Sequence, residues 1–241
     1  MKIIIFSTDT KHHTYFINKI AEYAVPFDIC SVIYERKKLV KSYPTGPFWE
    51  REEGEFEEKF FEEVDRELKV NKKMVEVHSV NSKHLVKYIE SLNPDLGISF
   101  GTGIIKPYIY NIPKYGTVNV HRGAIKDYRG LDSDLWALYD KKFDKLNVTI
   151  HYIDENLDTG DVLDEQNCPL DKIQELYEIE YYTTCLATKM ILKLLSKFQS
   201  EGKLKGMKQK KLGKYYSAMP TDKKWEAQNN FDIVKGRRYN G

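Results

Sequence analysis

Three polar side chains in this sequence have the types and spacing needed for acid–base chemistry. Asn119 and His121 stand two residues apart in "NVHRG", at the end of an apolar run, and Asp158 lies downstream in the turn "LDTGD". An imidazole can accept or donate a proton near neutral pH, a carboxylate can orient it, and an amide can donate to a developing oxyanion. No serine or cysteine stands where a nucleophilic triad would need one. Direct transfer between a bound donor and a bound nucleophile is therefore favoured over a covalent acyl-enzyme.

A sheet covered by helices is the arrangement that can bring these side chains together. Short apolar, β-branched runs alternate with helical patterns, which predicts an α/β fold with a mainly parallel sheet. We predict strands at residues 2–7, 27–35, 74–80, 96–102, 117–121, 147–154 and 161–164, and helices at 12–23, 50–70, 82–92, 135–138 and 171–198. Ligands gather at the carboxyl edge of such sheets, so Asp158 is expected within reach of His121.

The stretch "GTG" after the strand at 96–102 has two interpretations. It lacks the third glycine of GxGxxG and is followed by Ile104, Ile105 and Pro107, which disfavours a dinucleotide fingerprint. It predicts either a loop that approaches a flat ligand closely or a plain turn. In the first case Gly101, Thr102, Gly103 and Ile104 offer backbone amides and an apolar wall.

Composition excludes several classes of protein. The 38 basic and 36 acidic residues leave a net charge of only +2, so no global field points to nucleic acid. Cys30, Cys168 and Cys185 are far apart and odd in number, which argues against a disulfide framework or a zinc site. No apolar run reaches the length of a membrane span, and the N-terminus turns polar too soon for a signal peptide. We expect a cytoplasmic protein without a bound metal or a membrane partner.

The pattern "NVHRG…YRG…W…TIHYIDENLDTGDVL" resembles the catalytic core of the folate-dependent formyltransferases, the family of the glycinamide ribonucleotide and methionyl-tRNA formyltransferases. The resemblance is specific over residues 95–165 and implies a Rossmann-like formyltransferase domain, with 10-formyltetrahydrofolate as cosubstrate. It implies Asn119, His121 and Asp158 as the catalytic residues. An acceptor amine would attack the formyl carbon, Asn119 and His121 would stabilise or protonate the oxyanion, and Asp158 would hold His121.

The tail "GKYYSAMPTDKKWEAQ" and the stretch "HHTYFINKI" look like the branch of nucleotide-sugar N-formyltransferases. That resemblance implies as acceptor an amino-deoxysugar attached to dTDP or GDP, most closely dTDP-4-amino-4,6-dideoxyglucose, for surface polysaccharide (O-antigen) synthesis. It also implies a homodimer. We therefore expect a catalytic domain at residues 1–200 and an extension at 201–241 with a short helix and a β-hairpin.

The substrate-binding side chains are sought at the first strand end and just after the catalytic pair. The candidates are Lys11, Tyr15, Arg122, Lys126, Tyr128 and Arg129. A solvated helix start at Lys11 and Tyr15, and ordinary loop charge for the others, are the competing interpretations. His151, inside a predicted strand, is expected to pack or bond locally. Asp154, Glu155 and Asp161 are expected to be turn formers or solvated charges.

Two alternatives stay open. A phosphoribosylglycinamide formyltransferase of purine biosynthesis would have no need of the "GKYYSAMP" tail. A non-catalytic folate- or nucleotide-binding regulator would not require all three catalytic residues. A tRNA substrate is not expected, because the tRNA branch resembles a longer chain with a C-terminal barrel.

Overall fold

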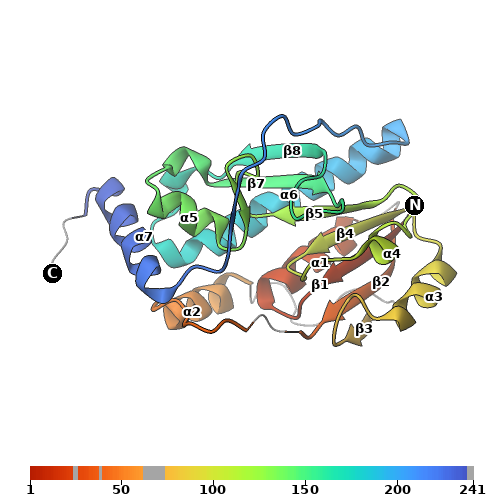
Figure 1. Ribbon diagram of the computed structural model, residues 1–241, viewed down its shortest axis with the longest axis horizontal. Helices are drawn as coiled ribbons and strands as arrows, with labels where there is room; N and C mark the ends of the chain where they lie inside the picture. The colour runs from red at the N-terminus through yellow and green to blue at the C-terminus, as the bar shows by residue number, and fades with distance from the viewer. Residues whose placement is uncertain (24–26, 38–39, 62–73, 238–241) are drawn as a thin grey trace.

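A seven-stranded sheet forms the centre of the molecule, in the order β3-β2-β1-β4-β5-β7-β8 (Figure 1). The computed structural model describes residues 1–23, 27–37, 40–61 and 74–237. The strands are β1 (Lys2–Ser7), β2 (Asp28–Glu35), β3 (Met74–Val77), β4 (Leu96–Phe100), β5 (Thr117–His121), β7 (Asn147–Tyr152) and β8 (Val162–Asn167). Strands β1 to β5 are parallel, whereas β7 and β8 are antiparallel to their neighbours. The predicted mainly parallel sheet is confirmed.

Helices cover both faces of the sheet because successive strand residues point to opposite sides. The helices are α1 (Lys11–Tyr23), α2 (Glu50–Phe61), α3 (Lys83–Leu92), α4 (Pro107–Tyr110), α5 (Ser133–Tyr139), α6 (Ile179–Glu201) and α7 (Thr221–Val234). Ile3 and Ile5 of β1 pack with α1 and α6, whereas Ile4 and Phe6 pack with α3 and α4. All four β1 side chains are fully buried, so β1 lies at the centre of both cores.

A second, smaller sheet corrects the prediction of a C-terminal β-hairpin. Strand β9 (Lys214–Tyr216) pairs in parallel with β6 (Tyr128–Gly130), not with another strand of the extension. The hairpin prediction was wrong because the chain enters α7 directly after Pro220, which leaves no second strand to pair. The predicted short C-terminal helix is present as α7, and it packs on α5 through a core that includes Phe231.

The bounds of α1, α3 and α5 differ from the predicted ones by one or two residues, those of α6 differ by more, and the short helix α4 was not predicted. The helix expected at 171–198 begins at Ile179, because residues 170–178 form two short 3-10 turns and the Glu178 carboxylate accepts a hydrogen bond from the Gln174 backbone N–H at 2.8 Å. The helix expected at 50–70 is helical through Phe61, and its remainder lies outside the described residues. Among the described helices, none has the length and apolar character needed to cross a bilayer.

Candidate active site

The three predicted catalytic side chains converge at the carboxyl edge of β5. His121 ends that strand, and its Nδ1 lies 3.6 Å from Oδ2 of Asp158. On its other side His121 Nε2 is 3.0 Å from the backbone carbonyl of Tyr128. Asn119 lies two residues earlier on the same strand face. The carboxylate therefore lies beside the imidazole of His121, as acid–base chemistry requires, and Asn119 lies on the same face of β5.

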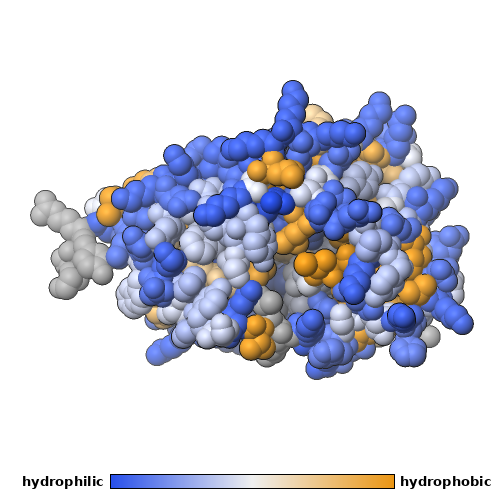
Figure 2. Space-filling view, viewed as in Figure 1, coloured by the Kyte–Doolittle hydropathy of each residue, from blue (hydrophilic) through white to orange (hydrophobic). Residues whose placement is uncertain are grey.

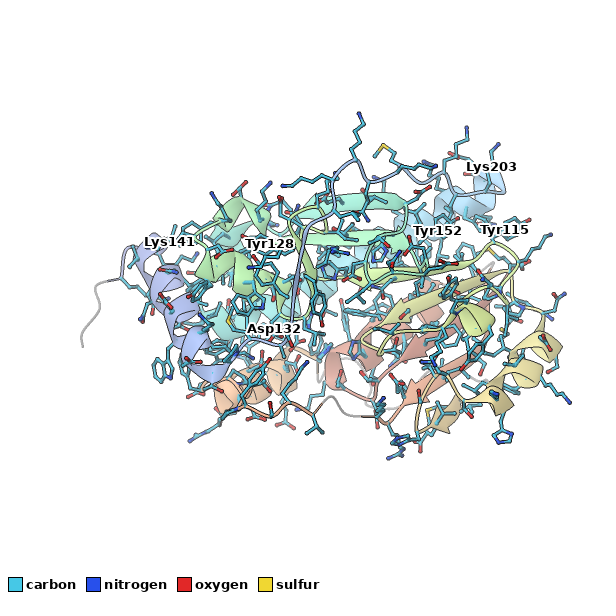
Figure 3. The ribbon with its side chains drawn as sticks, viewed as in Figure 1. Tyr115, Tyr128, Asp132, Lys141, Tyr152 and Lys203 are labelled. Atoms are coloured by element: carbon cyan, nitrogen blue, oxygen red, sulfur yellow. The ribbon has the colours of Figure 1, made fainter. Side chains whose placement is uncertain are left out.

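Strand β6 holds the Asp158 carboxylate in place. Asp158 Oδ2 accepts a hydrogen bond from the backbone N–H of Gly130 at 2.8 Å, so the β6 strand anchors the carboxylate. The Asp158 backbone has a φ of 55°, in the left-handed region that non-glycine residues rarely adopt. Tyr128, whose carbonyl faces His121, lies in the α5 half of the molecule, away from Tyr152 and Tyr115 (Figure 3). The β6 contacts to His121 and to Asp158 thus come from one short strand.

His151 also belongs to the site, which the sequence did not predict. It lies opposite Asn119 in the antiparallel β5–β7 ladder, and its Nε2 is 3.3 Å from Asn119 Nδ2 and 3.5 Å from Asp158 Oδ1. Its Nδ1 is 2.8 Å from the Tyr152 carbonyl. The alternation of "NVTIHYI" predicts which strand residues share one face of the sheet with His151. Only the register of β7 on β5 shows that Asn119 lies on that face beside His151.

The environment of the site lowers the pKa values of both His121 and Asp158. Burial lowers the pKa of His121 and is only partly offset by the Asp158 carboxylate. For Asp158 burial raises the pKa, but His121, His151 and the Gly130 N–H outweigh it and lower the pKa to about 2. At neutral pH the site therefore contains an ionised carboxylate next to a neutral imidazole.

The loop after β4 is held by side-chain hydrogen bonds, and it exposes apolar surface. Glu35 accepts a hydrogen bond from the backbone N–H of Gly103 at 2.7 Å, and the Asn81 side chain donates to the Ile104 carbonyl at 2.7 Å. Gly101 has a φ of 83°, and an added Cβ would lie 2.3 Å from the His13 ring. Thr102 Oγ1 lies 2.9 Å from Ser99 Oγ. Ile104 is 66% exposed, so this loop offers an apolar surface for contact. The Gly103 amide is not available to a ligand, because it already donates to Glu35.

The predicted substrate-binding residues already have partners within the protein. Arg122 contacts Glu180, Lys126 Nζ lies 3.0 Å from Glu165, and Lys11 Nζ lies 3.9 Å from Glu58. Arg129 donates to the Gly213 carbonyl at 2.6 Å and to the Leu157 carbonyl at 3.0 Å. The Tyr128 hydroxyl donates to Asp140, and the Tyr15 ring packs on Phe61. Of these side chains Lys126 and Lys11 remain about half exposed.

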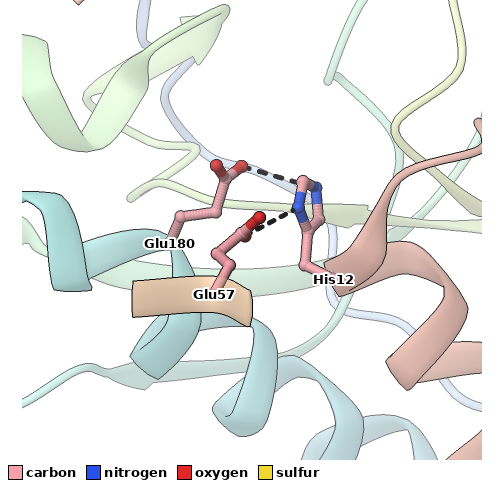
Figure 4. A group of neighbouring side chains, drawn as sticks. All are labelled: His12, Glu57 and Glu180. Carbon is pink, nitrogen blue, oxygen red and sulfur yellow. Dashed lines mark hydrogen bonds and ion pairs between the residues drawn. The ribbon is translucent and has the colours of Figure 1, made fainter. Parts of the chain in front are cut away.

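His12, Glu57 and Glu180 form a partly buried cluster (Figure 4). Glu180 also contacts Arg122. Nδ1 of His12 lies 3.1 Å from Glu57, and its Nε2 lies 3.4 Å from Glu180. These three residues have ligand types suited to a metal ion. The two carboxylates face different ring nitrogens, so His12 bridges Glu57 and Glu180.

Known proteins are similar to this chain in sequence. A protein-family profile described as formyl transferase matches residues 1–195. A methionyl-tRNA formyltransferase from Caldicellulosiruptor saccharolyticus is 29% identical over 175 residues, which covers 72% of this chain and 54% of the relative. Another, from Alkaliphilus metalliredigens, is 34% identical over 136 residues and covers 56% and 43%. The chain spans about half the length of the curated relatives it matches.

Solved structures share the fold at low sequence identity. A sugar N-formyltransferase from Shewanella sp has a TM-score of 0.63 and 17% identity, covering 96% of this chain and 87% of that chain. The formyltransferase PseJ from Anoxybacillus kamchatkensis, in complex with UDP-4,6-dideoxy-4-formamido-L-AltNAc and tetrahydrofolate, has a TM-score of 0.51 and 21% identity, covering 90% and 86%. At these identities the similarity shows a common architecture.

Proposed function

Because this chain belongs to the formyl transferase family, we propose that it transfers a formyl group from 10-formyltetrahydrofolate to the amine of a nucleotide-linked amino-deoxysugar. The observation that carries the proposal is the convergence of Asn119, His121 and Asp158 at the carboxyl edge of β5. A binding protein without turnover has no need of a buried imidazole held 3.6 Å from a carboxylate.

The residues after β4 fit a flat aromatic donor. Ile104 is exposed on a loop that Glu35 and Asn81 hold in place. The strand before this loop, β4, is paired with β5, which carries Asn119. Hydrophobic side chains also gather near the centre of the face in Figure 2. We propose that this loop, residues 101–104, forms one wall of the donor site. When bound, 10-formyltetrahydrofolate would supply the formyl carbon on a nitrogen that leaves.

The chain's own residues would then stabilise charge and move one proton. A new bond forms between the acceptor nitrogen and the formyl carbon, the carbon–nitrogen bond to the donor breaks, and one proton passes from the acceptor amine to the donor nitrogen. Asn119 Nδ2 carries two hydrogens. If His151 Nδ1 donates to the Tyr152 carbonyl, its Nε2 accepts one of these hydrogens, which leaves the other for the developing oxyanion.

His121 is placed to hold the migrating proton. If its Nε2 donates to the Tyr128 carbonyl, the Nδ1 atom that faces Asp158 has a lone pair at neutral pH. A proton taken up at Nδ1 would be stabilised by the ionised Asp158. Because burial lowers the pKa of His121, the imidazolium would release that proton readily to the leaving nitrogen.

The acceptor is assigned by resemblance, with the structural neighbours as support. The Shewanella structure is a sugar N-formyltransferase and is aligned over most of both chains. We propose dTDP-4-amino-4,6-dideoxyglucose as the acceptor, in surface polysaccharide synthesis. Lys126 and Lys11, whose side chains are about half exposed, are the proposed contacts to the phosphates. Arg122 and Arg129 would first have to give up Glu180 and the Gly213 carbonyl to reach a phosphate.

A parallel set of reactions tests the proposal. Purified protein is incubated with 10-formyltetrahydrofolate and, separately, dTDP- and GDP-linked amino sugars, glycinamide ribonucleotide and methionyl-tRNA, and products are weighed by mass spectrometry. The methionyl-tRNA reaction is included because the curated relatives carry that name. We expect a gain of one formyl group on the dTDP-sugar alone. A formylated product in a different reaction only would contradict the proposed acceptor, and no formylated product would contradict the activity.

A further inference from the structure

A segment beyond the family match braces the catalytic loop. Residues 207–216, here called the C-terminal strap, follow the region that the formyl transferase profile covers. In Figure 1 the chain before α7 crosses the molecule from the β8 side down to α7. Met207 and Val162 exchange two backbone hydrogen bonds at 2.8 and 2.9 Å, and β9 pairs with β6. The strap therefore contacts the chain on both sides of the Asp158 turn.

Gln209 binds this turn directly. Its Nε2 donates to the backbone carbonyl of Asp158 at 3.1 Å and to that of Gly160 at 2.9 Å. The opposite orientation of the amide would place its oxygen against two carbonyl oxygens, so the contacts require the nitrogen here. The Gln209 Oε1 atom is buried and has no hydrogen-bond partner among the described residues. Burying an unpaired acceptor costs free energy, which the two bonds from Nε2 must offset.

The strap also supports Asp158 through β6. Gly130, whose N–H binds the Asp158 carboxylate, is paired with Tyr216 in β9. Arg129 links the strap to the turn, since it donates both to the Gly213 carbonyl and to the Leu157 carbonyl. A Cβ on Gly130 would lie 2.1 Å from the Tyr216 carbonyl oxygen, so the two strands are in close contact.

We infer that Gln209 is a positioning residue for formyl transfer, which holds Asp158 in the left-handed conformation that aims its carboxylate at His121. This role rests on the proposed function of the site. A left-handed non-glycine residue costs on the order of 1–3 kcal/mol and persists where its surroundings over-determine it. Gln209 supplies two of the backbone contacts that do so, at Asp158 itself and two residues later. Its side chain has no contact with the reacting atoms in this scheme.

Two size-matched substitutions separate hydrogen bonding from packing. Gln209→Leu removes the donors, and Gln209→Glu keeps the shape but presents acceptors to two carbonyls. Lys208→Leu, at an exposed position of the same strap, is the control. We expect both Gln209 variants to lower kcat by up to about a hundredfold with KM for both substrates little changed, because a small misplacement of a catalytic group has that effect. The control should keep wild-type kcat.

A second measurement needs no substrate and decides the inference even if no acceptor is formylated. The ring of His121 is titrated by NMR in the folded wild type and in folded Gln209→Leu, and is assigned by comparison with His121→Asn. The Asp158 carboxylate raises the pKa of His121, so a displaced Asp158 lowers the titration midpoint. A lower midpoint in Gln209→Leu, but not in Lys208→Leu, supports the inference. An unchanged midpoint in folded Gln209→Leu overturns it, whereas a wild type that formylates no amine would overturn only the proposed function.

Discussion

Asp158 Oδ2 lies 3.6 Å from Nδ1 of His121, and both side chains are almost fully buried. The burial works on the two groups in opposite ways. Burial lowers the pKa of His121 below its ordinary 6.5. Burial alone would raise the pKa of Asp158, but His121, His151 and the Gly130 N–H lower that pKa to about 2. Over the physiological pH range the pair therefore consists of a neutral imidazole and an ionised carboxylate.

The pH dependence of turnover follows from this separation. Because the neutral form of His121 persists below pH 6.5, kcat/KM is expected to stay level from pH 8 through 6.5 and to fall only at lower pH. In Asp158→Asn the carboxylate that raises the His121 pKa is lost, so the acid limb should move to still lower pH while the plateau falls. Initial rates measured from pH 5 to 9 check both statements. A wild-type midpoint at or above 6.5 would contradict the lowered pKa.

Replacement of His121 by Asn should abolish turnover without unfolding the protein. The variant keeps a polar group near the Tyr128 carbonyl but cannot move a proton, so a loss of about a hundredfold to a thousandfold or more is expected. Circular dichroism and binding of the nucleotide sugar are measured in parallel and should be preserved. Near-normal turnover in the folded variant would rule out the proposed mechanism.

His151 is expected to contribute to catalysis even though it lies inside a strand. Its substitution by Leu removes the ring nitrogen that faces both Asn119 and Asp158, so the amide loses its fixed orientation. We expect kcat to fall by about tenfold to a hundredfold. Leu is comparable in bulk, so thermal unfolding controls for packing. A folded variant with wild-type kcat would assign His151 to the core alone.

Gly130 is expected to tolerate no side chain. Its φ is 98°, and a Cβ would meet the Tyr216 carbonyl oxygen at 2.1 Å. Gly130→Ala should therefore lower the free energy of unfolding by at least about 2 kcal/mol, and activity should fall because the same residue anchors Asp158. Gly54→Ala, in the interior of α2 with nothing within 4 Å of the new Cβ, should instead stabilise the protein by about 0.5–1 kcal/mol. Denaturant unfolding of the two variants side by side makes the comparison.

Stability should depend on pH through Glu53. Burial, with the nearby carboxylates of Glu180 and Glu57, raises the pKa of Glu53 from 4.5 to about 8. A raised folded-state pKa means that stability is full below pH 4.5 and is lost as pH rises toward 8. Glu53→Gln, which stays neutral, should therefore be more stable than wild type at pH 8.5, by up to about 5 kcal/mol for a shift of this size. The difference should vanish near pH 4.5. Urea unfolding at both pH values tests it, and an equal effect at the two would contradict the shift.

The order of the seven strands of the large sheet could be predicted from the sequence, whereas the short elements α4 and β6 were not predicted. The alternation of apolar β-branched runs with helical patterns located every strand of the large sheet, since a strand buried on both faces leaves a near-continuous apolar signature. The predictions failed where side chains override local preference. Glu178 caps the Gln174 backbone and delays α6, and Pro220 starts α7 where a hairpin strand was expected.

The sequence by itself determined which chemistry is available: an Asn, a His and an Asp at strand and turn positions whose spacing resembles one family. Tertiary structure alone decided which groups surround them. The antiparallel register of β5 and β7 places His151 beside Asn119, and the parallel pairing of β6 with β9 joins the C-terminal strap to the turn of Asp158. Such contacts depend on strand register and on the approach of distant segments, and neither leaves a periodic signal in the local sequence.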